Sequence, residues 1–115
     1  MKMNSITNVE RKIDLVVIST EGYLNKDLGE SILVIAKEHI AEGFIKFLIN
    51  LKDSNIVNSI GASIMIELIE ELQDKDGELA FCSLAPIVEK TFTIMGLTKY
   101  CSTYESQEAA LNAMA

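Results

Sequence analysis

Runs of strand-forming residues alternate along this chain with segments of helical periodicity, and this alternation limits the folds open to it. Residues 44–49 form the most strand-like run, and residues 13–19 form another that is apolar almost throughout. Each run precedes a segment whose apolar residues return at helical spacing, namely residues 28–40 and 60–72. Strands separated by helices imply parallel neighbours joined by right-handed crossovers. The pattern therefore predicts a single α/β domain.

Turn and cap residues set the boundaries of the elements. We expect Asn25 to cap the first helix and Gly43 to end it, and we expect Glu21-Gly22 to break the preceding strand. A polar loop is expected between residue 49 and the second helix. The other predicted elements are a short first strand at 5–9, a strand at 79–83, a helix at 87–95 with Pro86 in its first turn, a strand at 100–103 and a helix at 105–113.

Length and charge narrow the classes of protein to consider. A chain of 115 residues has room for one core, so we expect one domain over residues 1–115. The net charge is −7 and no basic cluster is present, which argues against binding to nucleic acid or to an anionic membrane surface. The first residues lack the apolar core of a signal peptide, and no apolar run reaches the roughly 20 residues that cross a bilayer. A cytoplasmic location is the expectation.

The residues that carry catalytic chemistry are scarce. His39 is the only histidine, and we expect it at the surface near the end of the first helix. Cys82 and Cys101 have no zinc-site spacing and are expected to be buried, reduced thiols. No glycine-rich phosphate loop is present. We therefore predict a protein that is not an enzyme and that needs neither a metal nor another cofactor.

The entrance to the second helix is the most informative polar segment. It reads Asn58-Ser59-Ile60-Gly61-Ala62 and follows the strand and its polar loop. The free N–H groups and positive dipole end of a helix favour an added anion, so a phosphate on Ser59 would be tolerated there. Alternatively, Asn58 or Ser59 is simply the N-cap of the helix, because both residue types are favoured at that position.

Several segments, in order and at matching separation, resemble the STAS domains of the anti-sigma factor antagonists. That family has a strand ending in Asp-Leu and an Asp-Ser-Ser-Gly-Leu type helix entrance, which correspond here to Asn50-Leu51 and to residues 58–62. The likeness extends over almost the whole chain. The further matching segments are Gly22-Tyr23-Leu24-Asn25, Gly77-Glu78-Leu79, Ser83-Leu84-Ala85-Pro86, residues 95–100 and residues 105–111.

This resemblance implies a STAS-type domain, with a mixed sheet of about four or five strands and about four helices. It also implies a bacterial partner-switching protein. In that family the unphosphorylated form binds an anti-sigma factor that is also a serine kinase of the ATPase type, phosphorylation releases it, and a serine phosphatase resets the cycle. The serine in the matching position is Ser59. The helix entrance and the expected partner surface comprise Asn58, Ile60, Gly61 and Ala62 together with Tyr23, Leu24, Asn25 and Ser54.

Departures from the family pattern keep a second hypothesis open. Asn58 replaces the family's Asp, Ile60 replaces its second Ser, and Ala62 replaces a larger aliphatic residue. The alternative is therefore a STAS module that is not phosphorylated and serves as a scaffold or ligand sensor, although a small-molecule ligand is not the leading expectation. Ser54 and Ser63 flank the same region as substitute phosphate acceptors. A small enzyme is a third hypothesis, disfavoured by the lack of acid–base groups.

Overall fold

The computed structural model describes residues 4–115, so residues 1–3 of the predicted domain lie outside the described residues. Within residues 4–115, five strands and four α-helices form one α/β domain, as predicted. The elements in chain order are β1 (Ser5–Arg11), β2 (Val16–Leu24), α1 (Lys26–Ala41), β3 (Lys46–Val57), α2 (Ser59–Gln73), β4 (Glu78–Cys82), α3 (Pro86–Ile94), a single 3-10 turn η1 (Leu97–Lys99), β5 (Ser102–Tyr104) and α4 (Gln107–Met114).

One mixed sheet holds all five strands in the order β1-β2-β3-β4-β5. β1 and β2 form an antiparallel hairpin, because only a tight turn separates them. The pairs β2–β3, β3–β4 and β4–β5 are parallel. One helix connects the two strands of each of the first two pairs, α1 between β2 and β3 and α2 between β3 and β4. The longer α3–η1 segment connects β4 to β5. The alternating sequence pattern predicts this arrangement.

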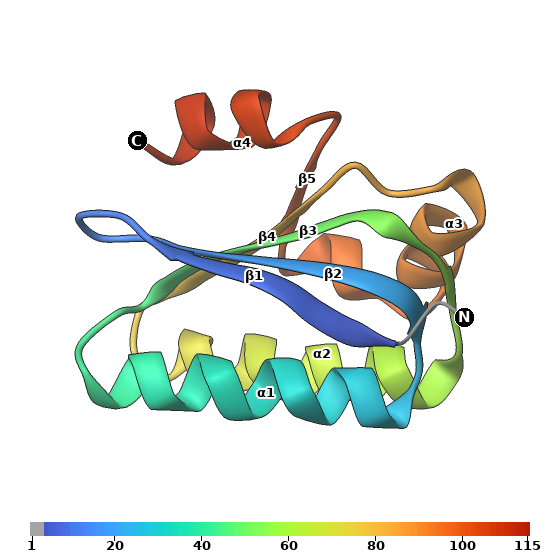
Figure 1. Cartoon of the computed structure of the whole chain (residues 1–115), viewed down its shortest axis with the longest axis horizontal. Helices are drawn as coiled ribbons and strands as arrows, with labels where there is room; N and C mark the ends of the chain where they lie inside the picture. Colours follow the sequence, from blue (N-terminus) through green and yellow to red (C-terminus); the bar gives the residue numbers. More distant parts are fainter. Residues whose placement is uncertain (1–3) are drawn as a thin grey trace.

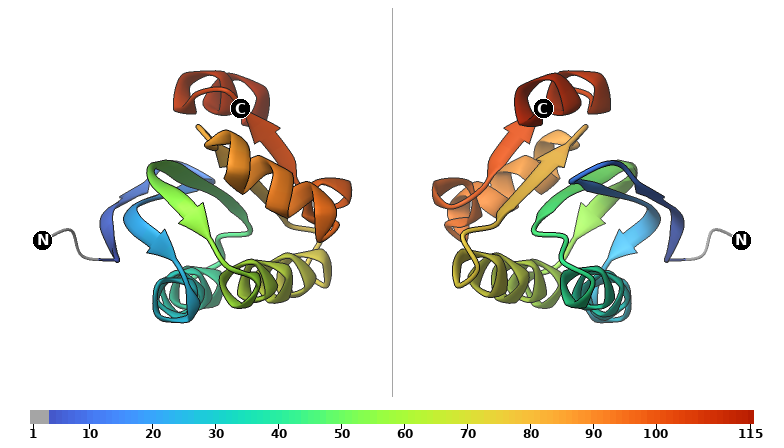
Figure 2. Two further views of the ribbon diagram at one scale, coloured as in Figure 1. Left: turned by 90° about the vertical axis from the view of Figure 1, so that its right-hand side faces the viewer. Right: turned by 90° about the vertical axis from the view of Figure 1, so that its left-hand side faces the viewer.

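The helices cover the two faces of the sheet unequally. α1 and α2 lie side by side beneath one face, and α4 lies over the other (Figures 1 and 2). The larger core lies on the α1–α2 side, where buried residues of β2, β3 and β4 meet Leu28, Ile32, Met65 and Leu68. α3 adds Phe92 to this core, and the Phe92 ring packs edge to face against Phe81 with ring centroids 4.9 Å apart. A smaller apolar cluster lies under α4.

Two strands extend further than the sequence predicts. β2 continues through the expected break at Glu21-Gly22, and β3 continues through the expected polar loop as far as Val57. The two extensions pair with each other, Tyr23 with Ile56 and Leu24 with Val57, across two irregularities in the register. Gly22 adopts a φ of 89°, which suits a strand irregularity. Mutual pairing of the backbone groups outweighs the polar character of these segments.

Ile13 marks a second boundary that differs from the sequence prediction. It lies in the turn between β1 and β2 and is fully exposed, so the strand begins at Val16 instead. The last helix begins at Gln107, after its N-cap Ser106, rather than at residue 105. The predictions for three other helix termini hold. The Asn25 side chain caps α1, Gly43 follows its end with a φ of 105°, and Pro86 is the first residue of α3.

The contact between Phe92 and Phe81 should contribute strongly to stability. Replacing the fully buried Phe92 by Ala leaves a cavity beneath β4, and we expect a loss of about 3–5 kcal/mol in the free energy of unfolding. Chemical denaturation followed by far-UV circular dichroism measures this loss. Ile94→Ala in the same helix is the control, because Ile94 is 74% exposed and should change stability by less than about 0.5 kcal/mol.

Candidate functional site

The entrances of α1 and α2 lie together at the carboxyl end of the sheet (Figure 1). The backbone N–H of Asn58 donates a hydrogen bond of 3.2 Å to the carbonyl oxygen of Leu24, which links the β3–α2 junction to the β2–α1 junction. Gly61 lies against the same carbonyl, and a Cβ added to Gly61 would lie 2.2 Å from the Leu24 oxygen. The glycine therefore permits the close approach of the two helix entrances.

Asparagine side chains cap both helices. Asn25 Oδ1 accepts a hydrogen bond of 3.1 Å from the Leu28 N–H, and Asn58 Oδ1 accepts one of 2.8 Å from the Gly61 N–H. Both caps have the extended backbone that an N-cap requires. Of the two capping possibilities at α2, the structure selects Asn58. Ser59 is therefore the first residue of the helix and not its cap.

Ser59 occupies a position where its hydroxyl can react and where a charge can be accommodated. Its side chain is exposed, on the first turn of a 15-residue helix. The first turn of a helix carries partial positive charge from its free N–H groups. The first turn of α2 contains no acidic side chain that would oppose an added anion. These features make the Ser59 hydroxyl accessible and compatible with a phosphate.

Exposed apolar residues flank this serine in the chain, and another lies on the neighbouring strand. Ile60 is 53% exposed and Ile56 is 57% exposed, while the Tyr23 side chain stands beside Ile56 on the neighbouring strand and is 37% exposed. Exposed apolar residues grouped at one end of a sheet are typical of a protein-binding surface. Ser59 and these three residues form what we call the entrance surface.

Three of the residues expected on the contact surface are buried, and the structure corrects their position. Leu24 and Ser54 are 1% exposed, and Ala62 is fully buried. The hydroxyls of Ser54 on β3 and Thr20 on β2 form a buried hydrogen bond of 2.7 Å, so each hydroxyl has a partner. For Ser54 the correction follows from the extension of β3, because a residue expected in an open loop lies within the sheet. Leu24 ends the extended β2, and Ala62 lies on the core-facing side of α2. Leu24, Ser54 and Ala62 are thus buried residues beneath the entrance surface and not part of it.

The remaining reactive groups in the described part of the chain are two cysteines and one histidine. Cys82 is buried and Cys101 is half-buried, and both are free thiols. Burial raises the pKa of Cys82, and it raises the pKa of Cys101 to about 11, so both thiols stay protonated near neutral pH. His39 is half-buried rather than a surface residue, and its Nδ1 lies 2.8 Å from the Ile35 carbonyl oxygen. Within residues 4–115, no three His, Cys, Asp or Glu side chains are grouped as a metal site.

None of the helices in the described part of the chain has the length and apolar character that a bilayer crossing demands.

The comparisons to known proteins agree with the fold. A family model for the STAS domain matches residues 6–110. The chain therefore belongs to the STAS domain family. Over 103 residues it is 25% identical to BtrV of Bordetella bronchiseptica, which carries the name of an anti-sigma factor antagonist, and the match covers 89% of each protein.

Solved structures extend the likeness at the level of the fold. A Thermotoga maritima protein named as an anti-sigma factor antagonist has a TM-score of 0.84 at 16% identity, with 92% of each chain covered. Bacillus SpoIIAA in its phosphorylated form has a TM-score of 0.75 at 20% identity, with 94% of this chain and 98% of that chain covered. SpoIIAA in its unphosphorylated form is described as an anti-sigma factor antagonist and has the same TM-score. The chain is thus a distant homologue of anti-sigma factor antagonists.

The close approach at Gly61 predicts a large effect of a single methyl group. Gly61→Ala places a Cβ against the backbone of Leu24, so we expect a loss of about 1–3 kcal/mol in the free energy of unfolding, although alanine favours helices. Denaturant unfolding measures this loss in the free energy of unfolding. Gly29→Ala is the comparison, because that Cβ would meet side-chain atoms of Ile64, with Cδ1 at 3.1 Å and Cβ at 3.2 Å, and no backbone atom. The expected loss is therefore smaller than at Gly61. Equal losses in the two variants would contradict the close approach.

The raised pKa of Cys101 predicts slow alkylation of the folded protein. Raising the pKa from 9.0 to about 11 lowers the thiolate fraction near pH 8 by about 100-fold, and the thiolate is the reactive form. Mass spectrometry after iodoacetamide treatment should show slow labelling of the folded chain, faster as the pH rises toward 11, and rapid labelling in denaturant. Labelling of the folded chain at the denatured rate would contradict the stated burial.

Proposed function

We propose that this protein is an anti-sigma factor antagonist that binds an anti-sigma factor with serine kinase activity of the ATPase type, and that phosphorylation of Ser59 releases it. The observation that carries the proposal is the exposed hydroxyl of Ser59, at the first residue of a capped helix and within an apolar surface. The family of the chain and its distant homologues support this class of partner. A serine phosphatase would return the protein to its binding form.

The switch follows from the charge and size of a phosphate. A partner that packs on Ile56 and Ile60, which lie on either side of Ser59 in the chain, would also cover the Ser59 hydroxyl. A phosphate there adds about −1.5 to −2 charges, which would have to lose their hydration on binding. A cost of about 2.7 kcal/mol weakens binding 100-fold. Free in solution, the same phosphate is stabilised by the first turn of α2, so the fold itself need not change.

One observation favours a second function, a STAS module that binds its partner without phosphorylation. Asn58 caps α2 through a hydrogen bond to the Gly61 N–H and brings no charge, where the family pattern has an aspartate. A kinase that recognises an aspartate at this position would then phosphorylate Ser59 inefficiently. In this case the entrance surface would hold its partner constantly, and Ser59 would be only an exposed residue at the start of the helix.

Binding measurements on serine variants distinguish these two functions. We expect the partner kinase, identified by its association with the wild-type chain, to bind Ser59→Ala at full strength and Ser59→Asp at least about tenfold more weakly. The kinase with ATP should phosphorylate the wild-type chain but not Ser59→Ala. Isothermal titration calorimetry and intact-mass measurements provide the two readouts.

Ser63→Ala and Ser63→Asp are the matched controls, because Ser63 is also exposed and lies one helical turn further along α2. Both should behave as wild type. If Ser59→Asp binds as tightly as wild type and the wild-type chain takes up no phosphate, the proposed switch is wrong and the constitutive module takes its place. If the Ser63 variants lose phosphorylation instead, the assignment of the switch to Ser59 is wrong.

A further inference from the structure

The helix α4 covers an apolar patch on the face of the sheet opposite α1 and α2 (Figures 1 and 2). In the described part of the chain, the helical side chains of the smaller core cluster all come from α4. The burial of this face therefore depends on one helix. The residues beneath it, which we call the covered patch, are Leu15, Val17, Leu48, Ala80 and Cys82, and all five are buried.

Few contacts hold α4 in place. Of its eight residues, Ala110 and Met114 are buried, and Leu111 is half-buried. One side-chain hydrogen bond joins α4 to the sheet, in which Asn50 Nδ2 donates to Gln107 Oε1 at 2.9 Å. Within residues 4–115, no ion pair includes a residue of α4. An isolated helix of this length is unstable in water, so α4 persists through its contact with the covered patch.

The strands under α4 are held together without it. β3 lies between β2 and β4 and pairs with both. Ile18, Phe47 and Phe81 of these strands belong to the larger core, which they form with α1, α2 and α3. The two buried clusters share no residue. Loss of the α4 contacts therefore removes the smaller cluster and leaves the larger one in place.

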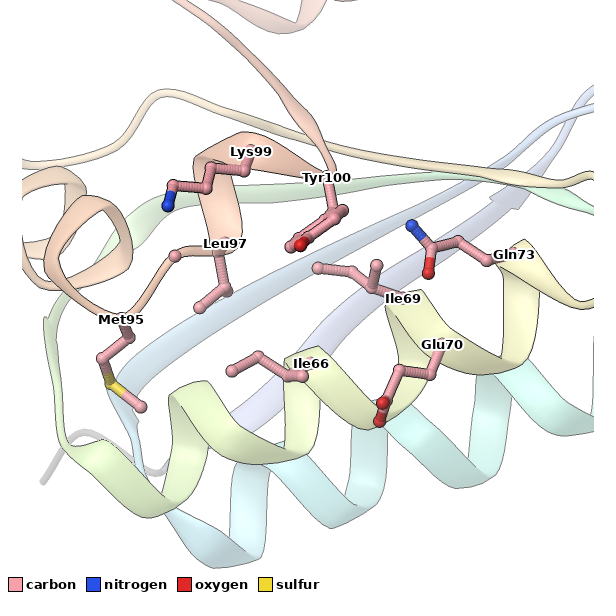
Figure 3. A pocket seen from close by; sticks show the side chains of 9 residues that line it. Ile66, Ile69, Glu70, Gln73, Met95, Leu97, Lys99 and Tyr100 are labelled. Atoms are coloured by element: carbon pink, nitrogen blue, oxygen red, sulfur yellow. The ribbon is translucent and has the colours of Figure 1, made fainter.

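The segment that precedes α4 is anchored to the rest of the fold. Ser102–Tyr104 pair with β4. Before them, Leu97 and Tyr100 face α2 across a hollow of about 460 Å³, on the side of the larger core (Figure 3). Residues 105–106 alone separate β5 from the first residue of α4. Backbone changes at these two residues are thus enough to detach α4.

We propose that α4 is a detachable cover, which opens as a unit while the rest of the domain stays folded, and that its opening gives access to Cys82 and the covered patch. Segments with few buried contacts open at a lower free energy than the core does. Cys82 is fully buried in the covered patch, so its thiol reacts only in the open state. The device does not involve Ser59, which begins α2 on the opposite face, and it does not depend on the proposed switch.

Alkylation of the two thiols in the folded chain tests the inference. Met114→Ala removes the larger of the two buried side chains that hold α4, so it should speed the labelling of Cys82 by iodoacetamide at least about tenfold at constant pH. Cys101 is the internal reference, because it packs against the larger core, and its rate should change less than about twofold. Mass spectrometry of the digested chain separates the two thiols.

Met65→Ala is the matched control, because Met65 is a fully buried methionine of α2 in the larger core. This variant should leave the ratio of the two labelling rates within about twofold of the wild-type ratio. Hydrogen exchange followed by NMR gives a second readout. In Met114→Ala the amides of residues 109–114 should exchange faster, while those of β4 keep their protection. Equal acceleration of both thiols by Met114→Ala, or loss of protection in β4 together with α4, would overturn the inference and place α4 in the same cooperative unit as the core.

Discussion

The contact between the β2–α1 and β3–α2 junctions is the constraint on which the functional end of this molecule depends. One carbonyl oxygen, that of Leu24, accepts the Asn58 N–H and faces Gly61 at a distance that leaves no room for a side chain. The contact forms because β2 and β3 remain paired up to their last residues. Two helix entrances with asparagine caps are thereby held side by side, and Ser59 is presented on the first turn of one of them.

The pairing of the two strands also explains which residues face solvent. Unbroken alternation along an extended strand would send Ser54 and Ile56 to the same face. The register irregularity between the pairs Glu21–Asp53 and Tyr23–Ile56 interrupts this alternation. Ser54 is buried, where Thr20 satisfies its hydroxyl, while Ile56 is exposed beside Tyr23. The same backbone arrangement thus supplies a buried support and an exposed apolar contact. Both are needed if a partner is to recognise a single serine at a defined position.

The sequence predicted the order of elements, their alternation and the position of the helix caps, because these depend on local spacing and on local hydrogen bonds. It did not predict that residues 50–57 are a strand. Their polar composition resembles a loop, and only pairing with residues 19–24 makes them extended. Pairing between segments distant in sequence has no local signature. For the same reason Leu24 and Ser54 were expected at the surface, whereas Ala62 is buried on the core-facing side of α2. Ser59 and Tyr23 were found exposed as expected.

The presence of phosphate on Ser59 in living cells tests the central claim most directly. Protein purified from its native cells, with phosphatases inhibited, can be examined by intact-mass measurement and by sequencing of the peptide that contains Asn58 and Ser59. The account predicts a population with one added phosphate on Ser59, whose fraction changes with growth conditions. A chain without phosphate under every condition, or with phosphate on Ser63 instead, would contradict the account.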